Sequence, residues 1–361
     1  MPAGYTGATN ATRLLYFLCL SDAQITDKES PAQAIEESYK GGVGSMPSCY
    51  SPTMLYTTQV LDAAIRTANA LHSEMPFDFA ISLGDDANGP QYNELQWFID
   101  VMDGKYITPS SGTNAGSETI DYQKPFQAAG LDPSIPWYAV MGNHDHLFMG
   151  GLPLQPFVPY FTNEYILALE GDFMGTIDGS TPDGNVIDVG PVTNFIVGGV
   201  TNTPTVAADA NRYGLTSSNW MSEFFNTTSQ PVGHGFSLDN VTNDFACYTF
   251  EPKTNVPIEV IVLDDTVNVV NGEGSLDAAH FNWLTNELQL GQSQNQLMIV
   301  AAHIPIELIG DSSAISSSTV IRLKHVEDQL VMRIGCFILR CGFRNQFSQR
   351  HLLKHVHAQN L

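Results

Sequence analysis

Short apolar runs alternate with amphipathic segments along most of this chain. Five apolar runs predict buried β-strands, at 14–20, 79–83, 135–141, 258–263 and 297–302. Between them, apolar residues recur at the spacing of a helix face over about 51–75, 91–102 and 275–290. The first helix also has a start signal, because Ser51 is followed by Pro52 at the first helical position. Strands that alternate with helices in this way predict a layered α/β fold.

Two segments do not fit this alternation. Residues 104–118 and about 179–211 are rich in Gly, Ser, Thr and Asn, which is typical of loops. We therefore expect one domain over residues 13–310, with an inserted loop region at about 151–240.

Residues 311–361 differ in composition from the rest of the chain. After a serine-rich segment at 311–318, residues 319–361 carry closely spaced Arg and Lys residues and only two acidic residues, Glu327 and Asp328. Such a basic tail can be an interaction arm. The abrupt change of composition favours a second interpretation, in which the tail is a truncated or out-of-frame end.

The acidic composition narrows the range of partners. The 361 residues include 15 Lys and Arg against 38 Asp and Glu, which gives a formal net charge of −23. Binding to phosphate backbones and anionic lipids depends on clustered cationic side chains, so nucleic acid is not expected as a bulk partner. The apolar run at 14–20 is shorter than a membrane span and leads directly into polar residues, and we interpret it as a strand.

The sequence leaves the compartment and the oligomeric state open. No signal or membrane segment is recognised, which fits a cytoplasmic protein or an exported protein whose signal is missing. The five cysteines are odd in number, scattered and without a CxxC pair. They predict neither a disulfide framework nor a cysteine-ligated metal.

Polar side chains of the types that bind metals follow four of the predicted strands. They are Asp22 and Gln24 after the first strand, Asp85 after the second, Asn143 and His144 after the third, and His303 after the last. Because loops at the carboxyl ends of parallel strands meet at one edge of a sheet, we expect these side chains to converge. Carboxylate, amide and imidazole groups together predict a metal-assisted hydrolase.

The residue types also suggest a division of roles. Asp85 follows a glycine at the end of a rigid strand, and we expect its carboxylate to bridge two metal ions. His144 lies next to a ligand and would protonate the leaving oxygen or stabilise charge on a phosphoryl group. The remaining predicted ligands are Asp22 and Gln24 at the first ion and Asn143 and His303 at the second.

Each of these residues also has an ordinary structural interpretation. Asp22 and Asp85 are of a type common in turns, and His303 inside an apolar run can be a core histidine. Asn88 can orient His144 or form a turn. The other residues considered are Asp145 and His146 as supporting residues of the site, the pair Asp264 and Asp265 as a polar strand end, and His72, His234 and His280 as structural histidines.

The strand-end fragments resemble the motifs of the calcineurin-like metallophosphoesterase superfamily. The fragments are Asp22-Ala23-Gln24, Gly84-Asp85-Asp86-Ala87-Asn88, Gly142-Asn143-His144-Asp145 and Ala302-His303-Ile304-Pro305. The resemblance covers about residues 13–310, and Gly-Asn-His-Asp is its most specific part. It implies a four-layer αββα sandwich, two divalent or trivalent ions (Mn, Fe or Zn), and hydrolysis of a small phosphomonoester or phosphodiester.

Two features depart from the superfamily pattern. Gln24 stands where relatives usually have His, and an amide oxygen is a harder ligand that favours zinc less. The usual late Gly-His-x-His is matched only by Lys354-His355-Val356-His357, close to the end of the tail. A second hypothesis is therefore a catalytically impaired or incomplete relative that acts as a non-enzymatic scaffold or binding protein. Metal content distinguishes the two hypotheses, since an intact site binds about two ions.

Overall fold

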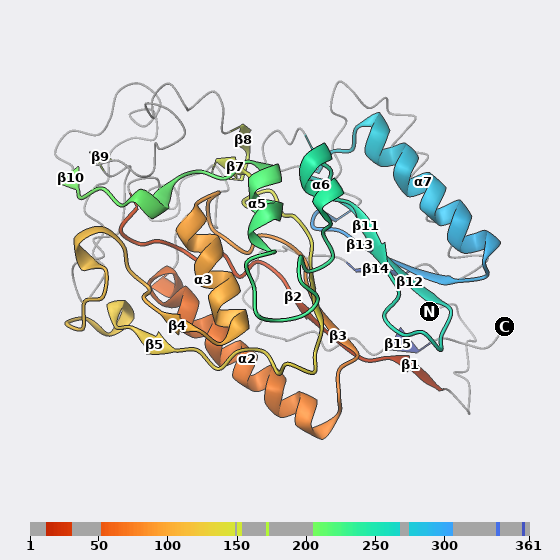
Figure 1. Cartoon of the computed structure of the whole chain (residues 1–361), viewed down its shortest axis with the longest axis horizontal. Helices are drawn as coiled ribbons and strands as arrows, with labels where there is room; N and C mark the ends of the chain where they lie inside the picture. The colour runs from red at the N-terminus through yellow and green to blue at the C-terminus, as the bar shows by residue number, and fades with distance from the viewer. Residues whose placement is uncertain are drawn as a thin grey trace, which may run out of the picture.

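A computed structural model describes residues 12–30, 52–148, 150–153, 171–172, 205–267, 274–305, 337–339 and 356–357 (Figure 1). The predicted tail at 311–361 lies outside the described residues, apart from two short strands. So does most of the first part of the predicted inserted loop region, 154–204.

Three parallel strands form the first sheet, in the order β2, β3, β6. Their bounds are Phe17–Leu20, Phe79–Ser82 and Trp137–Ala139. Helices α2 (Thr57–Glu74) and α3 (Tyr92–Asp103) contact each other and share a hydrophobic core with this sheet. Because the strands are parallel, their carboxyl ends and the loops that follow them lie at one edge of the sheet.

Four strands form the second sheet, in the order β11, β12, β13, β14. Their bounds are Tyr248–Phe250, Ile258–Val262, Leu297–Ala301 and Phe337–Leu339. β11 is antiparallel to β12, and the other neighbours are parallel. Helix α7 (Ala278–Ser293) connects β12 to β13 and contacts both, as a helix does in a parallel crossover.

The two sheets meet through aromatic side chains. The ring of Tyr138 stacks on that of Phe250 with centroids 3.6 Å apart, and the ring of Phe79 meets Phe250 edge-on at 5.4 Å. The hydroxyl of Tyr248 donates a hydrogen bond of 2.7 Å to the carbonyl oxygen of Ala139. A residue from β11 thus caps a polar group of β6 inside the shared core, so the sheets are held together by packing and by a buried hydrogen bond.

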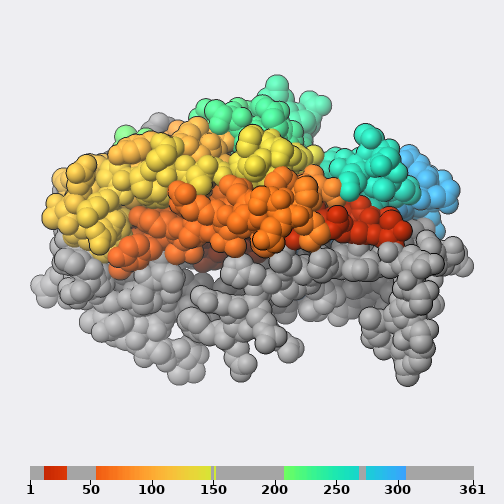
Figure 2. All heavy atoms as spheres, turned by 90° about the horizontal axis from the view of Figure 1, so that it is seen from below, coloured from red at the N-terminus to blue at the C-terminus, as the bar shows by residue number. Residues whose placement is uncertain are grey.

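Alternate residues of β12 and β13 face different partners, as the two-residue period of a strand requires. Val260 and Val262 belong to the core shared with the first sheet, whereas Ile261 belongs to the cluster that includes Leu284 and Leu288 of α7. α7 (blue) lies at one end of the molecule, away from α2 (orange), in Figures 1 and 2. The described part of the chain is therefore α/β.

The predicted strands and helices are confirmed, with boundaries that shift by a few residues. The predicted strand at 14–20 is divided into β1 (Arg13–Leu15) and β2, because the backbone of Tyr16 turns to the loop before β3. Its N–H donates to Asp78 Oδ2 at 2.8 Å, and its carbonyl accepts from the Asp78 N–H. The predicted helix at 51–75 begins as a 3-10 turn, η1 (Pro52–Tyr56), before α2.

The second part of the predicted inserted loop region, from residue 207 on, contributes to the core. Helix α5 (Ser217–Glu223) supplies the fully buried Trp220, and Phe224 follows it. The other short elements are β4 (Tyr106–Ile107), η2 (Gly112–Asn114), η3 (Asp121–Gln123), β5 (Phe126–Gln127), β7 (Leu147–Phe148), β8 (Leu152–Pro153), β9 (Gly171–Asp172), β10 (Thr205–Val206), η5 (Ala210–Arg212), α6 (Leu238–Asn243) and β15 (Val356–His357). Among the described helices, none is both long enough and apolar enough to cross a membrane.

We predict that Phe79→Ala destabilises the protein by about 3–5 kcal/mol, because it leaves a cavity where the two sheets meet. The Phe79 side chain is fully buried and contacts the rings of Phe17 and Phe250. Equilibrium unfolding in urea measures the effect. Val60→Ala is the control, since Val60 on α2 is 53% exposed and its truncation should change the free energy of unfolding by about 0.5 kcal/mol or less. Similar losses in the two variants would contradict a close contact between the sheets at Phe79.

Candidate metal centre

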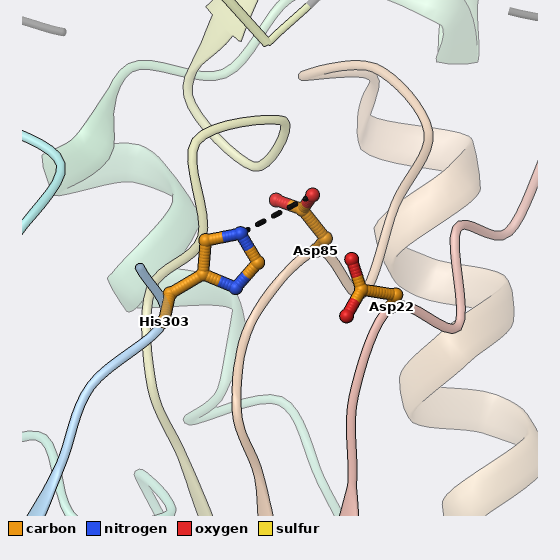
Figure 3. A group of neighbouring side chains, drawn as sticks. All are labelled: Asp22, Asp85 and His303. Carbon is orange, nitrogen blue, oxygen red and sulfur yellow. Dashed lines mark ion pairs between the residues drawn. The ribbon is translucent and has the colours of Figure 1, made fainter. Parts of the chain in front are cut away.

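Three of the predicted ligands converge at the carboxyl edge of the sheets. Ligand atoms of Asp22, Asp85 and His303 all lie within 4.8 Å of one another (Figure 3). Asp22 follows β2, Asp85 follows β3, and His303 follows β13, so both sheets contribute. Asp85 and His303 are buried, whereas Asp22 is partly exposed. The group therefore has a protected interior and one accessible side.

Asp85 lies between two other predicted ligands. Its Oδ2 is 3.4 Å from Nε2 of His303 and 3.4 Å from Nε2 of Gln24. Its Oδ1 accepts a 2.8 Å hydrogen bond from the backbone N–H of His144. One oxygen is thus fixed by the backbone, and the other faces the middle of the group. Gln24 lies beside the group, and its amide can present Oε1 after half a turn about its last bond.

Asn143 is oriented with its oxygen toward the group. Its Nδ2 donates a 2.6 Å hydrogen bond to the carbonyl oxygen of Gly150, and its Oδ1 lies 2.9 Å from Nε2 of His303. A carbonyl can only accept, so Gly150 fixes which end of the amide is nitrogen. Asn143 can therefore offer a neutral oxygen ligand from the third loop.

His303 is held so that Nε2 faces the carboxylates. Its Nδ1 donates a 2.8 Å hydrogen bond to the carbonyl oxygen of Leu83, which leaves Nε2 for the site. Burial lowers the pKa of His303, but the negative charges of Asp85, Asp22 and Asp265 outweigh it and hold the pKa well above its ordinary value. The imidazolium is the positive charge that balances the group in this structure.

The site holds more buried carboxylates than this one imidazolium can balance. Burial would raise the pKa of Asp85, yet His303 and His144 hold that pKa below its usual range. Burial and the charge of Asp85 raise the pKa of Asp145 to about 7, and burial raises that of Asp265 to about 7. Among the described residues, Oδ2 of the buried Asp86 has no hydrogen-bond partner. Carboxylate oxygens beside an imidazole are the kinds of donor that fit divalent cations such as Mn, Fe or Zn.

Backbone strain marks the same loops. Asp22, Gln24 and Asp85 adopt φ angles of +54°, +40° and +55°, in the left-handed region that such residues rarely occupy. Each such residue costs of order 1–3 kcal/mol and persists only where its surroundings enforce it. Here the loops are joined beyond the sheet, since Asp22 N–H donates to the Gly84 carbonyl at 3.0 Å and Gln24 N–H to the Asp85 carbonyl at 2.9 Å. The three strained residues, Asp22, Gln24 and Asp85, are all candidate ligands.

Two glycines allow the strand ends to come this close. A Cβ at Gly142 would lie 2.2 Å from the backbone nitrogen of Asp85 and 2.3 Å from its Oδ1. A Cβ at Gly84, where φ is +92°, would lie 2.6 Å from the nitrogen of Gly142 and 2.9 Å from Nδ1 of His303. No larger side chain fits at either position without moving a candidate ligand.

The carboxylate of Asp145 joins the loops after β3 and β6. Its Oδ2 accepts from the N–H groups of Asp85 at 2.9 Å and Gly142 at 2.7 Å, and its Oδ1 accepts from those of Asp86 at 3.0 Å and Ala87 at 3.2 Å. Asp145 is fully buried. It is a supporting residue of the site, as considered from the sequence, because it holds the backbone of the candidate ligand Asp85.

His144 is oriented by the backbone of residue 88. Its Nδ1 donates a 2.7 Å hydrogen bond to the carbonyl oxygen of Asn88, and the ring is partly exposed. Of the two interpretations of Asn88, the structure supports the one in which residue 88 orients His144, but the orienting atom is a backbone oxygen, which any residue type would supply. Nε2 of His144 is the nitrogen that remains for a substrate.

Two supporting residues were not recognised as such from the sequence. Both oxygens of the buried Asp265 accept from the N–H of Ile304 at 3.1 Å, next to His303, so this residue is more than a polar strand end. Its signal was its place after β12, the same pattern that identified the candidate ligands. Glu94 accepts from the N–H groups of Asp27 at 2.7 Å and Gly89 at 2.8 Å and so ties together the first two loops. A glutamate in the first turn of a helix carries no signal of this role.

The three histidines that we interpreted as structural from the sequence each have a structural contact. His234 is stacked on Trp137 and hydrogen-bonded at both ring nitrogens, and burial lowers its pKa to about 4. His72 bonds to Ser134 and to the backbone of Phe77. Asp277 caps α7 by accepting from the backbone N–H of His280, and its Oδ1 lies 2.8 Å from Nδ1 of that histidine.

The histidines of the tail are only partly described. The backbone of His357 pairs with Arg13 in the β1–β15 ladder. Arg13 begins β1, whereas Asp22 follows the end of β2, so the backbone of residue 357 lies at the far end of this strand pair from the metal group. The side chain of His357 and all of His355 lie outside the described residues.

Comparison with known proteins gives no independent assignment. No protein-family model matches the chain, and no curated protein matches it. The geometry of the site therefore carries the interpretation.

We predict that Gly150→Ala weakens metal binding by about 10–100-fold, the usual effect of disturbing a group that orients a ligand. A Cβ at Gly150 would lie 2.3 Å from Nε2 of His144 and 2.6 Å from Nδ2 of Asn143. Titration with Mn²⁺, followed by calorimetry, measures the change in Kd.

Gly116→Ala is the matched control for Gly150→Ala. The φ angles are +75° and +68°, so both alanines strain the backbone, but a Cβ at Gly116 would have no neighbour within 4 Å. The control should lose about 1–2 kcal/mol of stability and keep its affinity for Mn²⁺. Equal affinities in the two variants would show that the contact of Gly150 with Asn143 and His144 does not matter for the site.

Proposed function

We propose that this protein is a metal-dependent phosphoester hydrolase of the calcineurin-like metallophosphoesterase type, acting on a small phosphomonoester or phosphodiester. The convergence of Asp22, Asp85 and His303 within 4.8 Å, on loops from two sheets, is the observation that carries the proposal. The succession of α2 and α3, two sheets and α7 supports the four-layer αββα sandwich that the resemblance implies.

Two ions would be held by these residues, with Asp85 as the candidate shared ligand. Oδ2 of Asp85 lies 3.4 Å from Nε2 of Gln24 and 3.4 Å from Nε2 of His303. Asp22 and Gln24 would hold one ion, and Asn143 and His303 the second. When bound, two such ions polarise the phosphoryl oxygens and supply an activated water at neutral pH.

The protein's own residues then orient the reaction. Asp145 holds the backbone of Asp85, and this restrains the position of the Asp85 carboxylate during the reaction. His144 keeps a proton on Nδ1 through its bond to the Asn88 carbonyl, so the imidazolium form carries its transferable proton on Nε2. That proton can pass to the leaving oxygen, which would otherwise depart as an unstable alkoxide.

One observation favours the alternative, a catalytically impaired scaffold. Among the described residues, the metal group contains a single imidazole, His303, and Gln24 replaces the usual histidine beside it. A site with few imidazoles binds zinc-like ions weakly. Metal content and turnover distinguish the two functions.

The first test is metal content together with hydrolysis of p-nitrophenyl phosphate and bis(p-nitrophenyl) phosphate, with and without Mn²⁺. We expect about two bound ions and Mn²⁺-dependent turnover. Asp85→Asn should lose both metal and turnover, because it removes the shared carboxylate. His144→Asn should keep its metal and lose about 10²–10⁴-fold in kcat, because only proton transfer is removed.

His72→Gln is the control for these variants, since His72 is bonded to Ser134 outside the site. It should retain both metal and activity. Wild-type protein that binds no metal and hydrolyses neither ester would overturn the hydrolase proposal and favour the scaffold.

We predict that Gln24→His tightens binding of Zn²⁺, because imidazole is a better ligand for this ion than an amide oxygen. Gln24 lies beside Asp85, so the new ring would enter the site. Competition with a chromogenic chelator measures Kd, and Gln59→His on α2 serves as a control away from the metal loops. An unchanged Kd for Gln24→His would exclude residue 24 from the ligand set.

A further inference from the structure

Residues 143–147 form a single turn of helical type beside the candidate ligands. The N–H of Leu147 donates to the carbonyl of Asn143 at 3.0 Å, which closes the turn. Successive side chains in such a turn point about 100° apart. Asn143 therefore has His144 on one side and His146 on the other, while Asp145 points the opposite way into the protein.

The two histidines that flank Asn143 are anchored to different sheets. His144 bonds through Nδ1 to the carbonyl of Asn88, in the loop after β3. Nε2 of His146 lies 2.9 Å from Oγ1 of Thr266, in the loop after β12. Each ring uses one nitrogen for its anchor and keeps the second.

The hydrogen bonds of Thr266 define which nitrogen of His146 carries the proton. The Thr266 hydroxyl donates to Oδ1 of Asp264 at 2.7 Å, and the Thr266 N–H donates to the same oxygen at 2.9 Å. A hydroxyl has one hydrogen, so Oγ1 must accept from His146. Nε2 of His146 is then protonated, and Nδ1 has the lone pair.

Nδ1 of His146 has no hydrogen-bond partner among the described residues, and the ring is partly exposed. Thr266 and Asp264 behind it are buried. His234, by contrast, has both ring nitrogens bonded. A histidine with a buried anchor and a free basic nitrogen is built like an oriented base.

The charges around His146 are acidic. Burial lowers its pKa, and the carboxylates of Asp264, Asp244 and Asp85 act in the opposite direction without overcoming burial. A histidine with a pKa below its ordinary value is neutral at neutral pH and can accept a proton.

The geometry points to His146 as a second catalytic residue, a general base whose Nδ1 takes a proton from the attacking water on the side of Asn143 opposite His144. This inference rests on the proposed function. In the step, the water oxygen forms a bond to phosphorus, and the bond from phosphorus to the leaving oxygen breaks. One water proton passes to Nδ1 of His146, and the leaving oxygen receives the proton on Nε2 of His144. Both histidines then exchange protons with solvent.

Two substitutions of His146 distinguish a general base from a residue that only stabilises the fold through its bond to Thr266. Glutamine places an amide nitrogen near the position of Nε2, so His146→Gln keeps a donor for Thr266 and removes Nδ1. Asparagine reaches only the position of Nδ1, so His146→Asn loses the bond to Thr266. We expect His146→Gln to keep the melting temperature and metal content of the wild type. Its kcat for bis(p-nitrophenyl) phosphate should fall about 10²–10⁴-fold, and the acidic limb of its pH profile should disappear.

The role of His146 as a base would be overturned if His146→Gln kept wild-type turnover and pH profile and only His146→Asn lost stability. His146 would then have a structural role alone. The hydrolase proposal would survive that result, because it fails only if the wild-type protein itself shows no Mn²⁺-dependent turnover.

A second measurement does not depend on activity. Nitrogen NMR of protein with ¹⁵N-labelled histidine rings, with His146→Gln to assign the signal, should show the tautomer protonated at Nε2. A ring protonated at Nδ1 would contradict the assignment of the lone pair and with it the proposed base.

Discussion

The site depends on one buried carboxylate, that of Asp145, which accepts four backbone N–H groups from the loops after β3 and β6. These N–H groups lie where the strands end, so no further strand could satisfy them. Leaving a buried donor without a partner costs about 1–3 kcal/mol, and an ionised acceptor forms stronger bonds than a neutral one. Asp145 therefore supplies the hydrogen-bond acceptors that a neighbouring strand would supply within a sheet, and the two loops can follow different paths. It fixes the backbone of Asp85, whose Oδ2 lies 3.4 Å from Nε2 of Gln24 and 3.4 Å from Nε2 of His303.

This arrangement concentrates unfavourable free energy at the end of the sheets. Asp22, Gln24 and Asp85 have left-handed backbones, and the pKa values of Asp145 and Asp265 are raised to about 7 by burial. Neither strain nor buried like charges would persist without compensation elsewhere. The compensation within the fold is the apolar core shared by the two sheets, where Phe79 and Trp137 are fully buried. A bound cation would add a second contribution, because it is stabilised by the same charges that burial penalises.

The sequence predicted the strands, the helices and the convergence of Asp22, Asp85 and His303 because each depends on local signals. Apolar runs of strand length, helical spacing and polar residues just past a strand are all contained in a few consecutive positions. The supporting contacts join residues far apart in the chain and could not be predicted in this way. Thr266 lies far from His146 in sequence, and the pairing depends on how the loops after β12 and β6 come together. The role of Asn88 was predicted, but its backbone oxygen performs it, and side-chain identity carries no information about such an atom.

The short segment from Gly142 to His146 contains both a candidate ligand and residues that make long-range supporting contacts. Gly142 permits the close approach to Asp85, and the next four side chains point in directions about 100° apart. Asn143 faces His303 of the second sheet, His144 bonds to a loop of the first, Asp145 holds the backbone, and His146 bonds to the second sheet again. Because this one segment is bonded to both sheets, any shift of one sheet against the other would lengthen the bond of His144 to Asn88 or the bond of His146 to Thr266. The aromatic contacts between Phe79, Tyr138 and Phe250 restrain that shift, so packing in the core helps to preserve both bonds.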